Sequence, residues 1–85
     1  MRFGTAGREA IDYAVVLLYF SGETVETIRV YDGAHGHNEM HRYVSGGVKQ
    51  AGEVFHAGTP GEGMRAAIAA VKHGYLEMIE GWKRQ

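Results

Sequence analysis

The sequence predicts an α+β fold, in which a four-stranded antiparallel sheet, built as a meander of hairpins, has one long C-terminal helix packed on one face. Residues 11–56 carry runs of β-forming side chains separated by glycine-containing turns. Residues 60–84 carry apolar side chains three or four positions apart, which is the period of a helix. Because the strands come first and the helix last, an α+β plan follows, with one sheet face left open.

Length and composition limit what such a chain can be. The 85 residues suffice for a single domain, 1–85, with a small core. The chain has no cysteine, which suits a reducing compartment, so we expect a cytoplasmic protein. Nine Lys+Arg against ten Asp+Glu argue against broad electrostatic capture of nucleic acid. The longest apolar run, 13–20, is far shorter than the roughly 20 residues of a membrane span, so no membrane partner is expected.

The N-terminal part predicts an arm followed by a buried strand. Residues 1–9 show no periodicity, and we expect a loose N-terminal arm. Residues 11–20 are rich in Ile, Tyr, Val and Phe, and both of their alternating faces are apolar. A strand of this kind is either central in the sheet or covered by a second subunit.

The second strand alternates, and the direction of its side chains follows from that alternation. In residues 25–32, Ile28 and Val30 share one face, while Arg29 and Tyr31 share the other. We expect a hairpin with the preceding strand, and we expect Arg29 and Tyr31 on the open face.

The third and fourth strands, 38–44 and 48–56, meet at a turn formed by Gly46 and Gly47. If these glycines form a two-residue turn, His37 faces His56, Glu39 faces Val54, His41 faces Gly52 and Tyr43 faces Gln50. Gly52 then marks a bulge or a close approach between strands. This register places one set of side chains on the open face and another toward the helix. The open-face set is His37, Glu39, His41, Tyr43 and His56, and the helix-side set is Met40, Val44, Ala51 and Phe55.

Three residues within four positions predict where the helix begins. Thr59 suits the N-cap, Pro60 suits the first helical position, and Glu62 completes a capping box with Thr59.

The predicted open face gathers imidazole, guanidinium, carboxylate and phenol groups, and three interpretations stay open. The first is a solvated sheet face without chemistry. The second is metal-independent acid–base cleavage of RNA through its 2′-hydroxyl, with His as acid and base and Arg on the phosphate. The third is a metal site formed by His35, His37 and His56 with Asp32 orienting one imidazole, which requires the loop to curl inward.

One segment resembles a known family. Residues 29–37, Arg-Val-Tyr-Asp-Gly-Ala-His-Gly-His, followed by His41-Arg42-Tyr43, resemble the TumE-type toxins of bacterial toxin–antitoxin systems and related small uncharacterised proteins. Those proteins have a strand ending in Arg-x-Tyr-Asp-Asn-Ala-His-Gly, then a His-Arg-His-like segment and a terminal helix. The order of elements matches over about residues 12–84, and the specific part is about fifteen residues.

The resemblance assigns motif positions to individual residues. Those positions are Arg29, Asp32, His35, His41 and Arg42. Gly33 replaces the expected Asn, and Tyr43 stands in place of the second His of the His-Arg-His segment. The second departure leaves His37 or His56 as the other imidazole of a two-histidine mechanism.

The resemblance implies an intracellular toxin silenced by a cognate antitoxin, commonly a DNA-binding protein. The leading hypothesis is therefore a toxin-like protein that cleaves RNA without a metal or other cofactor. In it His41 and His37 act as general base and acid, Arg29 and Arg42 bind phosphate, and Asp32 and His35 shape the loop. The chief alternative is a non-enzymatic interaction module, a homo-oligomer or partner-binding protein that uses its open sheet face. A His-based metal-dependent enzyme comes third.

Overall fold

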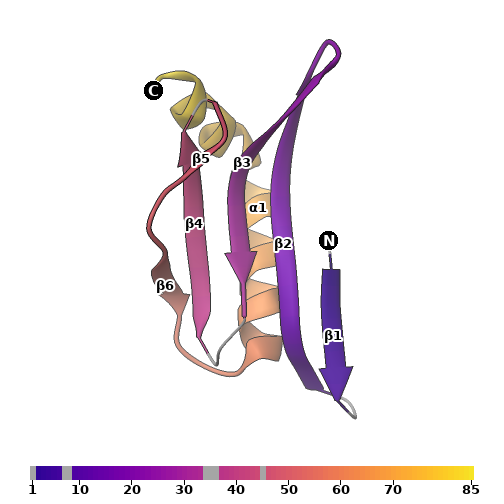
Figure 1. The fold of residues 1–85 in the computed structure, drawn as a ribbon. Coiled ribbons are helices and arrows are strands. Elements are labelled where there is room, and N and C mark those ends of the chain that lie inside the picture. The colour runs from indigo at the N-terminus through magenta and orange to yellow at the C-terminus, as the bar shows by residue number, and fades with distance from the viewer. Residues whose placement is uncertain (1, 7–8, 34–36, 45) are drawn as a thin grey trace.

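The computed structural model describes residues 2–6, 9–33, 37–44 and 46–85, with side chains described from Asp12 onward. In these residues, six antiparallel strands form one sheet, and a single helix packs against it, running behind β2 and β3 in Figure 1. The predicted α+β fold is confirmed. The elements are β1 (Arg2–Ala6), β2 (Glu9–Ser21), β3 (Thr24–Asp32), β4 (Asn38–Val44), β5 (Val48–Lys49), β6 (Glu53–His56) and α1 (Pro60–Lys83).

The first strand was not expected. Residues 2–6 form β1, which pairs with β2 from Arg2 opposite Ala14 to Ala6 opposite Glu9. The prediction of a loose arm is therefore wrong for these residues, and residues 1, 7 and 8 lie outside the described part. The physical reason is that β2 is 13 residues long and offers an edge of backbone N–H and C=O groups that β1 pairs with.

The predicted fourth strand is divided in two. β5 and β6 both pair with β4, and residues 50–52 between them leave the ladder. Glu39 faces Val54 as predicted, but His56 faces Asn38 instead of His37, and Tyr43 faces Lys49 instead of Gln50. The cause is a register shift between Asn38 and Glu39 at one end, and the break between the two short strands at the other.

A bulge in the β2–β3 pair reverses the predicted faces of β3. Leu17 pairs with Arg29 and Leu18 with Thr27, so Ile28 is an extra residue in the ladder. Beyond the bulge, Tyr31 pairs with the buried Val15 and is itself buried. The prediction that Arg29 and Tyr31 point to the open face is therefore wrong: both lie on the face that α1 covers.

The core lies between the sheet and α1. Its buried side chains are Tyr13, Val15, Tyr31, Met40 and Ala67, and partly buried residues such as Phe55, Met64, Ile68 and Val71 pack against them. The predicted helix-side positions of Met40 and Phe55 are thus confirmed. Among the described residues, no helix is long and apolar enough to cross a membrane.

The start of α1 follows the predicted capping pattern. Thr59 is the N-cap, its hydroxyl accepts from the backbone N–H of Glu62, and the Glu62 carboxylate accepts from the backbone N–H of Thr59. Pro60 is the first helical residue. This capping box fixes where the chain leaves β6 and turns across the sheet.

Candidate functional site

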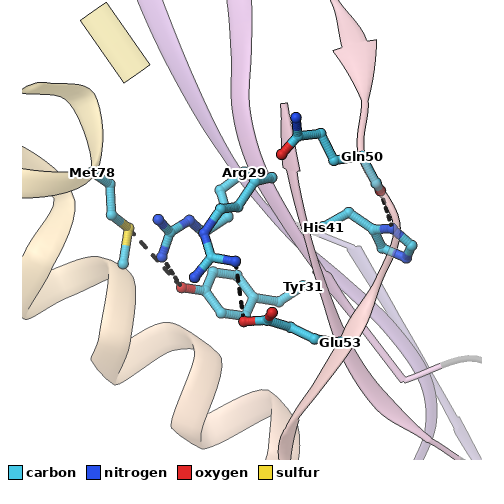
Figure 2. A network of polar contacts seen from close by, with 7 residues as sticks. Arg29, Tyr31, His41, Gln50, Glu53 and Met78 are labelled. Carbon is cyan, nitrogen blue, oxygen red and sulfur yellow. Dashed lines mark hydrogen bonds and ion pairs between the residues drawn. The ribbon is translucent and has the colours of Figure 1, made fainter. Parts of the chain in front are cut away.

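The sheet separates the predicted site residues into two groups. Asp32, Glu39 and His41 lie on the open face, the side away from α1, because they alternate with the buried Tyr31 and Met40. Arg29 and Arg42 are cross-strand partners on the opposite, helix-covered face. Figure 2 shows the separation, with Arg29 and Tyr31 directed toward Met78 of α1 and His41 directed toward the chain at Gln50. The predicted site that joins imidazoles and guanidinium groups on one surface is not assembled.

On the open face, His41 is held between three acceptors. Its Nε2 lies 3.7 Å from Oδ2 of Asp32 and 3.9 Å from Oε1 of Glu39, and its Nδ1 lies 3.1 Å from the carbonyl oxygen of Gln50. Only 14% of the side chain is exposed. Only the contact with Gln50 is at hydrogen-bond distance, and the two carboxylate contacts are ion pairs only when the ring is protonated.

The position of His41 follows from its neighbours. Asp32 and Glu39 are directly opposite each other, and two like charges so placed destabilise a sheet unless a positive group lies nearby. His41 is two residues from Glu39 on the same face and supplies that charge when its ring is protonated. A Cβ at Gly52 would lie 2.6 Å from Cε1 of His41, so the missing side chain makes room for the ring. The prediction of a close approach at Gly52 is confirmed.

On the helix-covered face, the two arginines are not equally paired. Nη1 of Arg42 forms an ion pair of 3.1 Å with Oε1 of Glu53. Nη1 of Arg29 donates only a long hydrogen bond, 3.4 Å, to the Tyr31 hydroxyl, which donates to Sδ of Met78 at 4.0 Å. Within the described part of the chain, the enclosed Nε of Arg29 has no partner. Arg29 is thus a partly buried cation without a carboxylate partner among the described residues.

A cavity of about 160 Å³ lies beside these arginines, between β3, β4 and the last turns of α1. Arg29, Arg42, Glu77 and Trp82 line it. Tyr43, expected beside His41, lines this cavity as well.

The remaining histidines are not brought to His41. His35 lies outside the described residues. His37 is exposed before β4, and His56 lies at the end of β6 opposite Asn38. In the described ranges, no group of three or more His, Asp or Glu residues could hold a metal ion, and the predicted set of His35, His37 and His56 includes one residue that falls outside those ranges.

Sequence reasoning missed a buried polar centre at Asn38, which is only 3% exposed. Its Oδ1 accepts a 2.8 Å hydrogen bond from the Tyr13 hydroxyl, and its Nδ2 donates to the carbonyl oxygens of His56, Gly58 and Thr59. Burial, with a smaller contribution from the Asp32 charge, raises the pKa of Tyr13 to about 12. A Cβ at Gly63 would collide with the Asn38 amide, so the first turn of α1 packs directly on this centre. The sequence signal for this centre is that Asn38 lies two positions before Met40 in the same strand, so both side chains are on the helix-covered face.

The open face also carries exposed apolar side chains, whereas the predicted set of open-face residues consisted of polar and aromatic ones. On β2, Val16 is 38% exposed, Leu18 39% and Phe20 69%. Val25, opposite Phe20, is 53% exposed, and Val54, opposite Glu39, is 60% exposed. The available signal was the run 13–20, which is apolar on both faces.

Compared with protein-family models, with curated proteins and with solved structures, the chain matches none of them. The resemblance to TumE-type toxins stays a prediction.

Proposed function

We propose that this chain is a protein-interaction module that associates with a second copy of itself through the open face of its sheet. The observation that carries the proposal is that β2 has large apolar side chains on both faces, whereas α1 covers only one. Tyr13, Val15 and Leu17 are buried under α1, and the alternate residues remain exposed. Folded monomers rarely leave a contiguous apolar patch in water.

The free apolar surface of β2 is its face. β3 pairs along one edge of β2 from Ala14 to Ser21, and β1 pairs along the other edge only from Glu9 to Ala14, which leaves that edge beyond Ala14 without a strand among the described residues. Val16 pairs with Val30, Leu18 with Thr27, and Phe20 with Val25, which makes a largely apolar stripe across β2 and β3. Figure 1 looks onto this face, with the β2–β3 hairpin projecting beyond the end of β4. Covering such a stripe yields about 25 cal/mol for each Å² of apolar surface removed from water.

The size and charge of the face fit a second copy. The molecule measures 40 × 23 × 22 Å, and a sheet face of that outline offers on the order of 800 Å² per copy, the size of a standard interface. A two-fold axis through the stripe places apolar surface on apolar surface. When the His41 ring is protonated, it offsets the neighbouring Asp32 and Glu39 carboxylates, which reduces repulsion between the two copies.

A matched pair of leucine variants tests this proposal. Leu18→Lys places a cation in the stripe, whereas Leu76→Lys changes a leucine that is 65% exposed on α1. We expect Leu18→Lys to raise the dimer dissociation constant at least tenfold, because burying an unpaired charge is costly, and Leu76→Lys to leave it unchanged. Size-exclusion chromatography coupled to light scattering gives the mass of each variant. Equal masses for Leu18→Lys and the parent protein would contradict the proposal.

A toxin-type ribonuclease, kept in check by a DNA-binding antitoxin, is the second candidate. It is favoured by the contact of His41 with Asp32, since a carboxylate–imidazole pair can transfer a proton. The open face lacks the guanidinium groups of Arg29 and Arg42 that the hypothesis required for phosphate. If this candidate holds, purified protein cleaves RNA in EDTA, His41→Ala abolishes the cleavage, and His73→Ala on α1 does not. Intact RNA in EDTA rules it out.

A further inference from the structure

The cavity on the helix-covered face is independent of the proposed dimer surface. We propose that this cavity, between Arg29 of β3, Arg42 of β4 and Trp82 of α1, binds a phosphate group. Its volume of about 160 Å³ admits a phosphate ion or a small phosphate monoester.

The charge at the cavity is unbalanced. Arg29 and Arg42 are directly opposite each other, and like charges in that position destabilise a sheet. Arg42 has Glu53 as its partner, whereas Arg29 has no carboxylate within ion-pair distance in the described ranges. A partly buried guanidinium group without an anion is costly to maintain, so an anion bound here would relieve the cost.

The cavity also has free donors. A guanidinium group carries five N–H donors, and Arg29 uses one of them in a long hydrogen bond to Tyr31. The indole nitrogen of Trp82 and Nε of Arg29 are enclosed and have no partner among the described atoms. Buried donors are normally paired, so each of these calls for an explanation, and both belong to side chains that line the cavity.

The donors favour phosphate over carboxylate. They come from three elements that surround the cavity: β3, β4 and α1. A tetrahedral oxyanion accepts hydrogen bonds from several directions, whereas a planar carboxylate is satisfied by one guanidinium fork.

Opposing charges are also present. Glu77 lines the cavity, Glu53 holds Arg42, and the C-terminal end of the α1 dipole is negative. We therefore expect phosphate to compete with Glu53 for Arg42. The affinity for phosphate then depends chiefly on Arg29.

Trp82 provides the test, because it is the one tryptophan of the chain and lines the cavity. The full chain is titrated with sodium phosphate, with glycerol 3-phosphate and with sodium acetate, at constant ionic strength made up with chloride. We expect a saturable change of Trp82 fluorescence with phosphate. A matching response to the ester would identify a phosphate monoester site, whereas a response to phosphate alone would identify a site for the free ion.

Variants connect the response to the site. Arg29→Met weakens phosphate binding at least tenfold, because it removes a charge-assisted donor set. Arg65→Met, on an exposed turn near the start of α1, leaves binding unchanged. If circular dichroism shows Arg29→Met to be unfolded, Arg42→Gln takes its place. The proposal is overturned by the absence of a saturable response, by equal binding in the arginine variant, or by acetate binding as tightly as phosphate.

Discussion

At the scale of single residues, the hydrogen bond between Tyr13 and Asn38 joins β2 to β4, two strands that are not neighbours in the sheet. Tyr13 is fully buried on β2, and Asn38 is buried on β4 and binds the carbonyl oxygens that precede α1. Since five polar groups meet there, losing one leaves a partner unsatisfied.

Replacing Tyr13 tests this centre. We expect Tyr13→Phe to lower the free energy of unfolding by about 1–3 kcal/mol, because Oδ1 of Asn38 then lacks its donor. The measurement is urea denaturation at neutral pH. Tyr75→Phe, at an exposed tyrosine of α1, is the control and leaves the stability unchanged.

The same tyrosine predicts an alkaline effect. The pKa of Tyr13 is about 12 in the folded chain, against 10.0 for the ordinary group. Because the folded-state pKa of Tyr13 is raised, the stability that its protonated hydroxyl contributes is fully present below about pH 10. It is lost as pH rises through about 12. Tyr13→Phe therefore shows a shallower loss of stability between these pH values than the parent protein. Parallel pH profiles for the two would show that Tyr13 has no such role.

Several residues of the site could be predicted, and others could not, for a definite reason. The approach of His41 to Gly52 follows from strand alternation and a glycine that admits a ring. The face of Arg29 was predicted wrongly because the extra residue at Ile28 shifts the alternation, and the run 25–32 carries no glycine or proline to mark that bulge. Gly33 is closed to any side chain by the ring of Tyr13, at the position where the resembling family has Asn.

At the scale of elements, the start of α1 was predictable because its determinants are local. The capping box needs only Thr59 and Glu62, three residues apart. β1 was not predictable, because Gly4, Thr5 and Ala6 have no β pattern and the strand exists through pairing with the long edge of β2. The division of the fourth strand likewise depends on pairing with β4.

The capping box gives a prediction at this scale. Thr59→Ala removes the acceptor for the Glu62 N–H, and we expect a loss of about 1 kcal/mol in unfolding free energy. Thermal unfolding followed at 222 nm measures it. Thr24→Ala, which removes a turn hydroxyl outside the helix, serves as a comparison.

Acid pH tests the other half of the box. Hydrogen bonds from the backbone and side chain of Thr59 lower the pKa of Glu62, with smaller contributions from His56 and Arg65. The stabilisation is present above the pKa of an unfolded glutamate and is lost as pH falls through the folded pKa. Glu62→Gln should flatten that part of the acid profile, and Glu80→Gln on the outer side of α1 should not. Equal flattening by both variants would mean that the box does not stabilise the folded chain.

At the scale of the whole molecule, the sheet has two unlike faces. The fold class could be predicted because the period of the apolar residues changes from strand-like to helical near residue 59. The division of chemistry between the faces could not, because it depends on the extra residue at Ile28. That bulge places Arg29 on the face that α1 covers, while His41, Leu18 and Phe20 lie on the open face.

Sedimentation equilibrium of the unmodified full chain tests the central claim, which is self-association through the open sheet face. We expect a mass twice that of one chain at high concentration, falling toward the single-chain mass on dilution. A single-chain mass at every concentration would contradict the claim.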